Sequence, residues 1–263
     1  VASGERLLAF AHAEPGMRGP TAEVTTTAAR EGDSWVLSGR KNPVLAGDCA
    51  DTLVVSAALP DGGTGLFLVD ATAVQRQPYR TFDGQRGAQI DFDKVPAEPL
   101  GDAVSGEHVS AAIGHTLVRI SSALCAEALG AMEEALRLTS EYLTQRKQFG
   151  VTLSKFQTLT QRAADMYVSL ELARSMALYA AMSVADGDLD PTIAARAKLQ
   201  IGRSGRHISQ EAIQLHGGIG VTDESPIGHY AARLTAIEYT LGSSQDQLHV
   251  LIGQLGDYEV VTI

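Results

Sequence analysis

The first hundred residues carry a two-residue alternation of apolar and polar side chains, which is the pattern of β-strands. Residues 25–30 and 34–39 flank a Glu31-Gly32-Asp33 turn and predict a β-hairpin. Further strand candidates are residues 52–56, 65–70 and 88–93. Short strands separated by Gly-rich turns predict a small antiparallel barrel or sandwich.

After Pro99-Leu100-Gly101 the apolar period becomes three to four residues, which is the spacing of an amphipathic helix. Its first run predicts one long helix and comprises Ile113, Leu117, Ile120, Leu124, Ala128, Ala131, Ala135, Leu138 and Tyr142. Asp190 and Pro191 predict the start of a later helix, because Asp caps helix N-termini and Pro fits the first helical position. Further helices are predicted at residues 155–185, 191–215, 226–239 and 243–255.

The change of period predicts two domains, a β domain at residues 1–102 and a helical bundle at residues 103–263. Helices longer than about 25 residues are unusual in a lone domain and fit a bundle that builds an oligomer interface. The chain opens Val1-Ala2-Ser3-Gly4, without Met and without a helix start signal. We therefore expect an N-terminal part of the gene product to precede residue 1.

Composition and charge argue against several function classes. The 263 residues carry a net charge of -10 and a pI of about 5.1, which disfavours nucleic acid and polybasic membrane contacts. No run approaches the roughly 18 apolar residues of a membrane span, so no membrane partner is expected. Cys49 and Cys125 are too few for a disulfide framework or a cysteine metal site, and the histidines lack metal-ligand spacing. A cytoplasmic location is the default expectation.

Several segments carry a family resemblance, and they follow the order of strands and then helices. Arg146-Lys147-Gln148-Phe149-Gly150 closes the first long helix and is followed by Phe156-Gln157. The segment from Gln210 to Gly220 has the sequence QEAIQLHGGIG. The β part contains Glu14-Pro15 and Gly39-Arg40-Lys41. Together these segments resemble the acyl-CoA dehydrogenases, flavoenzymes that introduce an α,β double bond into acyl-CoA thioesters.

The resemblance implies a fold and a cofactor. The β domain and the helical bundle correspond to the family's middle and C-terminal domains, without its N-terminal helical domain. In the family, FAD lies across a subunit boundary. The helical domain of one subunit holds the adenosine and pyrophosphate, and the β domain of its neighbour holds the isoalloxazine ring.

The resemblance also assigns roles to single residues. Arg146 would hold the pyrophosphate, since a guanidinium makes bidentate phosphate contacts. Phe149 would pack on the adenine side, Gln214 would hydrogen-bond the linker of the cofactor, and Gly217 and Gly218 would admit a close backbone approach. The remaining members of this cofactor set are Gln148, Phe156 and Gln157. Two plainer interpretations stay open, namely a solvated helix-end cation at Arg146 and a helix C-cap at the glycine pair.

The chain departs from the family at the catalytic base. The family usually places this Glu just before a Gly-Thr/Ser-Ser/Asn segment, where this chain has Leu241 before Gly242. Other members carry it on the first long helix, at the position of Ile120, and an Arg that often follows is Ser121 here. Abstraction of a thioester α-proton needs a positioned base, which contributes about 10²–10⁴-fold.

The β domain departs from the family as well. The usual Lys-x-Trp-Ile-Thr is Lys41-Asn42-Pro43-Val44-Leu45 here, so Pro43 and Leu45 replace the Trp and Thr that face the flavin ring. The usual Gly-Ser-Asp is replaced by Met17-Arg18-Gly19-Pro20. The resemblance therefore implies that the chain keeps the adenosine-binding half of the site and lacks the ring-binding half.

These departures predict the base-lacking subunit of a heteromeric FAD-dependent acyl-CoA dehydrogenase, resembling the α₂β₂ actinobacterial enzymes of sterol side-chain breakdown. The expected partners are a catalytic subunit, an acyl-CoA substrate and an acceptor of the electron-transfer flavoprotein type, within fatty acid β-oxidation or lipid metabolism. One alternative is a self-sufficient homo-oligomer with Glu238 as a relocated base, for which Asp246 and Glu127 are poorer candidates. Another alternative is a flavin-free scaffold.

Overall fold

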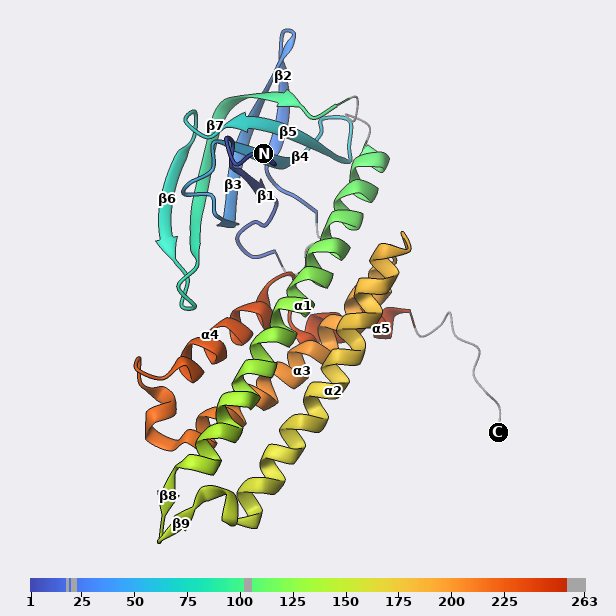
Figure 1. Ribbon diagram of the computed structural model, residues 1–263. Helices are drawn as coiled ribbons and strands as arrows, with labels where there is room; N and C mark the ends of the chain where they lie inside the picture. The colour runs from blue at the N-terminus through green and yellow to red at the C-terminus, as the bar shows by residue number, and fades with distance from the viewer. Residues whose placement is uncertain (18, 20–22, 102–105, 255–263) are drawn as a thin grey trace, which may run out of the picture. The chain divides into compact units, whose positions relative to one another are not determined.

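The computed structural model describes residues 1–17, 19, 23–101 and 106–254. The chain divides into two compact units, Val1–Gly114 and His115–Ile263. The first, which we call the β unit, holds strands β1 to β7 and the start of α1, and the second, the helical unit, is mainly helical (Figure 1). The domain boundary predicted between residues 102 and 103 lies outside the described residues.

A seven-stranded sheet forms the β unit. Its strands are β1 (Leu8–Ala11), β2 (Thr27–Glu31), β3 (Ser34–Leu45), β4 (Thr52–Ala58), β5 (Thr64–Asp70), β6 (Gln75–Arg80) and β7 (Arg86–Pro99). The pairings run from β4 through β2, β3, β7 and β5 and return to β4, which closes a ring. β2 and β4 meet at a single pair, Thr27 opposite Ala58.

The inner face of the sheet holds the core of the β unit. Burial alternates along β5, and in β7 Ile90 and Phe92 are buried while Asp93 is exposed. Trp35 is 8% exposed and its ring lies 5.4 Å from that of Phe67. The predicted hairpin is confirmed, because β2 pairs with β3 from Glu31–Ser34 to Thr27–Ser38.

The sheet differs from the prediction in two respects. β1 pairs with β4 in parallel, with Leu8 opposite Thr52, so the expectation of a purely antiparallel sheet is wrong. β1 and β6 are strands that the alternation does not predict. β6 has the sequence QRQPYR and buries none of its residues fully, which leaves no apolar face to detect.

Among the described residues from Gly106 onward, the chain forms five α-helices and two short 3₁₀ helices. They are α1 (Gly106–Gln145), η1 (Leu153–Lys155), α2 (Gln157–Ala185), α3 (Pro191–His216), η2 (Gly217–Val221), α4 (Pro226–Tyr239) and α5 (Ser244–Gly253). The four later predicted helices agree with α2 to α5 within about two residues, and the first predicted run, from Ile113 to Tyr142, lies inside α1. The predicted cap is confirmed, because the Asp190 carboxylate accepts a hydrogen bond from the Thr192 N–H at 2.8 Å.

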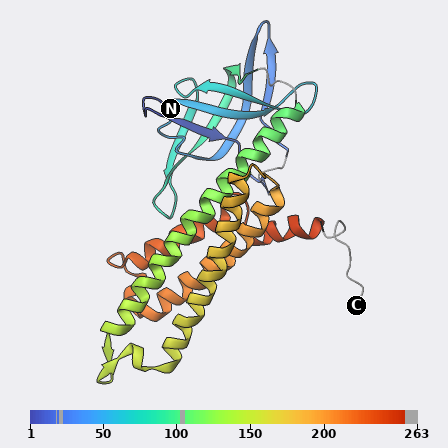
Figure 2. The ribbon, with the colours of Figure 1, turned by 45° about the vertical axis from the view of Figure 1, so that its right-hand side comes forward.

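The long helices run side by side, as Figure 2 shows from a second direction. Their shared core includes Cys125 and Met132 of α1, Met166 of α2 and Ile208 of α3, all fully buried. Arg162 of α2 holds Glu211 of α3 with two hydrogen bonds of 2.5 and 3.0 Å. The bundle is therefore joined by an apolar interior and by ion pairs at its surface.

The first helix is long and apolar enough, by length and composition alone, to cross a membrane. Within His108–Gln145, an 18-residue window has a mean hydropathy of 1.3, and 39% of this window is buried. The same helix supplies Cys125, Ala128 and Met132 to the bundle core. Core helices of soluble proteins pass the same test, so one such helix is weak evidence for a membrane span.

Candidate functional site

The chain turns sharply after α1. Two short strands, β8 (Lys147–Gln148) and β9 (Val151–Thr152), pair as a hairpin. Phe149 and Gly150 form its tip with φ angles of 53° and 84°, in the left-handed region. The Phe149 side chain is 91% exposed, which is exceptional for a large aromatic residue. A ring held outward at a strained backbone position is suited to contact with a ligand or another chain.

The hairpin is tied to the helices on both sides of it. The Leu153 N–H donates to the Arg146 carbonyl at 2.8 Å. The ring of Phe156, the residue before α2, lies edge-on to the Phe149 ring with centroids 6.2 Å apart. Gln148 and Gln157 are exposed beside it. Arg146 is also exposed, and its guanidinium has no partner among the residues that the structure describes.

The end of α3 supplies the second part of the predicted site. Gln214 is exposed, and the Nδ1 atom of His216 lies 2.8 Å from the Ala212 carbonyl oxygen. Gly217 follows with a φ of 66°, whereas Gly218 lies outside the left-handed region. A Cβ built on either glycine meets no atom within 4 Å. The backbone at Gly217 requires glycine, but the backbone at Gly218 does not, so a plain C-cap explains only the first.

One aromatic contact brings the two parts together. The rings of Tyr142 and His216 stack with centroids 4.5 Å apart. Tyr142 lies one helical turn before Arg146, whose N–H donates to the Tyr142 carbonyl at 2.8 Å, and His216 directly precedes Gly217. The predicted cofactor residues therefore gather at one end of the helical unit, where Figure 1 shows the β8–β9 hairpin.

The gathered groups suit the adenosine diphosphate part of a dinucleotide. Arg146, which has no partner among the described residues, supplies a cation for a phosphate, and the exposed Phe149 ring supplies a face for a purine. Gln214 offers an amide that donates and accepts hydrogen bonds. The open space above Gly217 and Gly218 leaves the backbone accessible. No group of three or more His, Cys, Asp or Glu suited to a metal ion occurs among the described residues.

Neither of the two positions that the family resemblance assigns to the base holds a carboxylate. Leu241 stands at the first and has a φ of 61°, and Gly242 follows it with a φ of 95°. Ile120 stands at the second, half-buried on α1, and Ser121 beside it is buried. The backbone of the turn between α4 and α5 is thus held in an unusual conformation around an apolar side chain.

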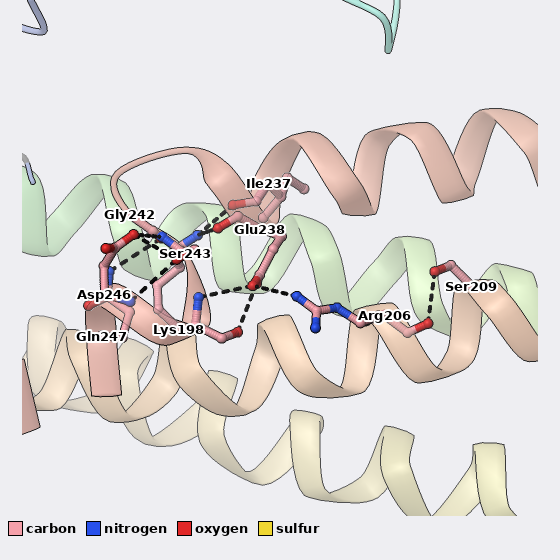
Figure 3. Close-up of polar contacts among 10 residues, drawn as sticks. Lys198, Arg206, Ser209, Ile237, Glu238, Gly242, Ser243, Asp246 and Gln247 are labelled. Carbon is pink, nitrogen blue, oxygen red and sulfur yellow. Dashed lines mark hydrogen bonds and ion pairs between the residues drawn. The ribbon is translucent and has the colours of Figure 1, made fainter. Parts of the chain in front are cut away.

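Glu238 is the nearest carboxylate before Leu241, and its oxygens are occupied (Figure 3). The residue is 5% exposed. Its Oε1 accepts from the Ser244 N–H at 2.9 Å and from Arg206 Nη2 at 3.3 Å, and its Oε2 accepts from the Ser244 hydroxyl at 2.9 Å. Three donors and deep burial leave little freedom to receive a proton from a substrate.

The two poorer candidates for a base are also engaged. The Asp246 carboxylate forms a capping box with Ser243 at the start of α5, accepting from the Ser243 N–H at 2.8 Å and the Ser243 hydroxyl at 2.6 Å. The Glu127 carboxylate accepts hydrogen bonds of 2.6 and 2.8 Å from Arg233 of α4. Each contact stabilises a helix or joins two helices, which is a structural role.

The Glu14 and Lys41 motifs of the β unit meet in a buried ion pair. Lys41 Nζ lies 2.6 Å from Glu14 Oε1, and both side chains are almost fully buried. Burial raises the pKa of Glu14, but hydrogen bonds from Lys41, Thr25 and Thr26 outweigh it and lower the pKa to about 2. Burial lowers the pKa of Lys41, which the Glu14 carboxylate opposes. The pair fixes the chain entering the sheet and is not open to a ligand.

The strand that carries the ring-binding motif in the family is irregular here. Pro43 lies where the pairing of β3 with β7 shifts register, between Lys41 and Val44. A proline fits such an irregularity because it cannot donate to the ladder. Leu45 is 48% exposed and offers no polar contact. Of the other departure, Arg18 and Pro20 lie outside the described residues.

A shallow hollow of about 860 Å³ opens on the β unit. It is lined by Gly39, Arg40, Ala73, Gln75, Gln77, Asp91, Phe92, Asp93 and Val95. Arg40 donates to Asp91 at 2.5 Å within it, so these two charges are paired. None of the predicted cofactor residues lines this hollow.

The family model described as "Acyl-CoA dehydrogenase, C-terminal domain" matches residues 113–255. The chain belongs to the acyl-CoA dehydrogenase family. The short-chain specific mitochondrial acyl-CoA dehydrogenase of Homo sapiens is 33% identical over 96% of this chain. This chain spans 64% of the length of that relative. Acyl-CoA dehydrogenases are FAD-dependent oxidoreductases that act on CH–CH bonds.

Solved acyl-CoA dehydrogenases share the fold. A variant of the "Tcur3481-Tcur3483 steroid ACAD" is 35% identical with a TM-score of 0.86, over 98% of this chain and 69% of that one. The "ChsE4-ChsE5 complex from Mycobacterium tuberculosis" is 27% identical with a TM-score of 0.84, over 98% of this chain and 68% of that one. Both units of this chain therefore have counterparts in acyl-CoA dehydrogenases of known structure.

Sequence reasoning missed the contacts that hold these segments. It listed Glu14 and Lys41 among the family motifs but did not predict that their side chains, 27 residues apart in the sequence, form a hydrogen-bonded ion pair. It did not predict that the rings of Tyr142 and His216 stack. It also overlooked Lys198, a fully buried lysine. A lysine on the apolar face of a predicted helix is a signal that could have found it.

Proposed function

We propose that this chain is the base-lacking subunit of a heteromeric FAD-dependent acyl-CoA dehydrogenase and supplies the adenosine diphosphate half of the cofactor site. The observation that carries the proposal is an asymmetry within the chain. The helical unit has an Arg146 that is unpaired in the described part of the chain and an open Gly217-Gly218 segment, and the stack of Tyr142 on His216 joins them. The base positions hold Leu241 and Ile120 instead of carboxylates.

A homo-oligomer needs both halves of the site from copies of one chain. This chain has Pro43 at a strand irregularity and the apolar Leu45 where the family presents Trp and Thr to the flavin ring. A partner chain that brings the ring-binding half and the base completes the site. Of the two solved relatives, one is a complex and the other a steroid enzyme named by two components, which supports a heteromer and a bulky sterol-derived acyl-CoA.

FAD, when bound, supplies the acceptor for the hydride that leaves the β-carbon of the acyl chain. The residues of this chain act at the other end of the cofactor. Arg146 would hold the pyrophosphate, Phe149 would cover one face of the adenine, and Gln214 would hydrogen-bond the linker. The base that takes the α-proton would belong to the partner, and the acceptor of the electrons would be of the electron-transfer flavoprotein type. These assignments share out one reaction between two chains.

A self-sufficient enzyme with Glu238 as base has weaker support. A general base must come within hydrogen-bond reach of the proton that it takes. The Glu238 carboxylate is buried and already accepts bonds from Ser244 and Arg206. A flavin-free scaffold is also less well supported, because a scaffold has no use for an unpaired Arg146 beside an exposed Phe149.

The test is purification of the full-length protein alone and together with its dehydrogenase-like partner. We expect flavin absorbance and acyl-CoA oxidation only in the mixed complex. A yellow, active homo-oligomer would overturn the proposal and make Glu238 the residue to mutate. A complex that turns over acyl-CoA but keeps its full FAD content when Arg146 is replaced by Ala would favour the scaffold.

A further inference from the structure

One face of α3 is built to receive the turn between α4 and α5. Lys198, Gly202 and Arg206 follow one another at intervals of four residues, so they lie on the same face. A Cβ built on Gly202 would lie 1.8 Å from Glu238 Oε2 and 2.2 Å from the Ser244 hydroxyl oxygen. Only glycine at this position lets the Glu238 carboxylate lie against the helix.

The two cations beside Gly202 bind different parts of α4. Lys198 Nζ donates to the carbonyl oxygen of Ile237 at 2.5 Å and to that of Glu238 at 3.4 Å, which satisfies acceptors at the end of α4. Arg206 Nη2 donates to the Glu238 carboxylate at 3.3 Å. Burial lowers the pKa of Lys198, while the Glu238 charge favours its ammonium form.

The Glu238 carboxylate links the last turn of α4 to the first turn of α5. It accepts from both the N–H and the hydroxyl of Ser244, at 2.9 Å each. From the other side, Gln247 Nε2 donates to the carbonyls of Leu241 at 3.0 Å and Gly242 at 3.4 Å. The left-handed backbone at Leu241 and Gly242 therefore lies between the Glu238–Ser244 contact and the bonds from Gln247. Figure 3 shows Glu238, Gly242 and Gln247 around this turn.

We propose that Glu238 is a positioning residue, which together with Lys198 and Gly202 fixes the α4–α5 turn, residues 240–243, as a rigid surface without a base. The inference rests on the proposed function, because that turn carries Leu241 where the family resemblance puts the catalytic carboxylate. Glu238 acts through the turn and transfers no proton itself. Hydrogen bonds from Gln247 hold the carbonyls of Leu241 and Gly242, although the turn carries Leu241 where the resemblance puts a carboxylate.

The matched pair Gly202→Ala and Gly205→Ala tests the contact without changing a titratable group. The methyl group added by Gly202→Ala would displace the Glu238 carboxylate, whereas a Cβ on Gly205 meets only the Leu234 side chain, at 3.5 Å. We measure hydrogen exchange of the amides at residues 238–247. We expect Gly202→Ala to speed exchange at Ser244 by at least about tenfold, and Gly205→Ala to leave it as in the native chain.

Native protection in Gly202→Ala would overturn the proposal. If that variant does not fold, Glu238→Ala carries the same measurement, since it removes the acceptors of Ser244 and leaves α3 unchanged. Native protection of Ser244 in Glu238→Ala would likewise contradict a positioning role. This experiment needs neither flavin nor a partner, so it stands even if the heteromeric assignment fails.

A second readout separates positioning from proton transfer. In the assembled enzyme, Glu238→Gln keeps an oxygen that accepts from the Ser244 N–H and an amide that can donate to the Ser244 hydroxyl. We expect kcat to fall by less than about tenfold with an unchanged pH profile, whereas loss of a general base costs about 10²–10⁴-fold. A loss of that size, with the acid limb of the profile removed, would overturn the proposal.

Discussion

The ring of His216 stacks on the ring of Tyr142 with centroids 4.5 Å apart, and this contact holds the end of α1 against the end of α3. Arg146 follows Tyr142 by one helical turn, and Gly217 follows His216 directly. The sequence separates the two segments by about seventy residues, and the stack makes them one surface. The proposed cofactor half-site depends on this contact.

Removal of the stack should loosen that surface. We expect Tyr142→Ala to lower the stability of the helical unit by about 1 kcal/mol for the aromatic pair, in addition to the loss of the ring's buried area, and to weaken FAD retention in the complex several-fold. Tyr142→Phe keeps the ring and serves as the control. Thermal unfolding and flavin absorbance after gel filtration measure the two effects. Equal FAD retention in both variants would disconnect the stack from the cofactor.

Arg146 should contribute to FAD binding without contributing to folding. Its side chain is exposed and has no partner among the described residues, so Arg146→Ala should leave the melting temperature unchanged. We expect FAD affinity of the complex to fall roughly 10- to 100-fold, as for a lost charge-assisted hydrogen bond. Lys147→Ala, at the next position, is the control for charge alone. Similar losses in both variants would point to nonspecific electrostatics.

The glycine pair allows binding to be separated from backbone strain. Gly217 has a φ of 66°, so Gly217→Ala should cost about 1 kcal/mol or more of stability. Gly218 lies outside the left-handed region and has open space above it, so Gly218→Ala should be tolerated by the fold. We expect Gly218→Ala to lower FAD affinity all the same. Unchanged affinity, measured by flavin titration of the complex, would mean that no cofactor approaches this backbone.

The buried ion pair of Glu14 and Lys41 should make the stability of the β unit depend on pH. The pKa of Glu14 falls from 4.5 to about 2 on folding, so its contribution is complete above pH 4.5 and is lost as the pH falls toward 2. Glu14→Gln should therefore cost about 3 kcal/mol at pH 7 and clearly less at pH 3. Urea unfolding followed by Trp35, the single tryptophan, reports on this unit. An equal cost at both pH values would contradict the assignment.

The sequence predicts most of the helices and strands, because the spacing of apolar residues within each segment is a local signal. The helix from Gly106 to Gln145 and the hairpin of β2 and β3 follow from spacing and turn residues. The parallel pairing of β1 with β4 does not, because it joins segments about forty residues apart without a local turn signal. Strand β6 is missed because it buries no face.

The candidate site divides in the same way. Arg146, Phe149, Gln214 and the glycine pair are found from motifs, and the structure brings them to one end of the helical unit. The fate of Glu238 could not be found from motifs, because its contacts with Gly202 and Arg206 depend on how α3 and α4 pack. Sequence spacing shows that a carboxylate is near in the chain, but not that its oxygens are already bound.

The number of FAD molecules per pair of chains tests the central claim most directly. Flavin absorbance combined with light-scattering mass gives this ratio for the full-length protein alone and for the co-expressed complex. The half-site account predicts no flavin in the lone protein and one FAD per pair in the complex. Stoichiometric flavin in the lone protein, or two FAD per pair, would contradict it.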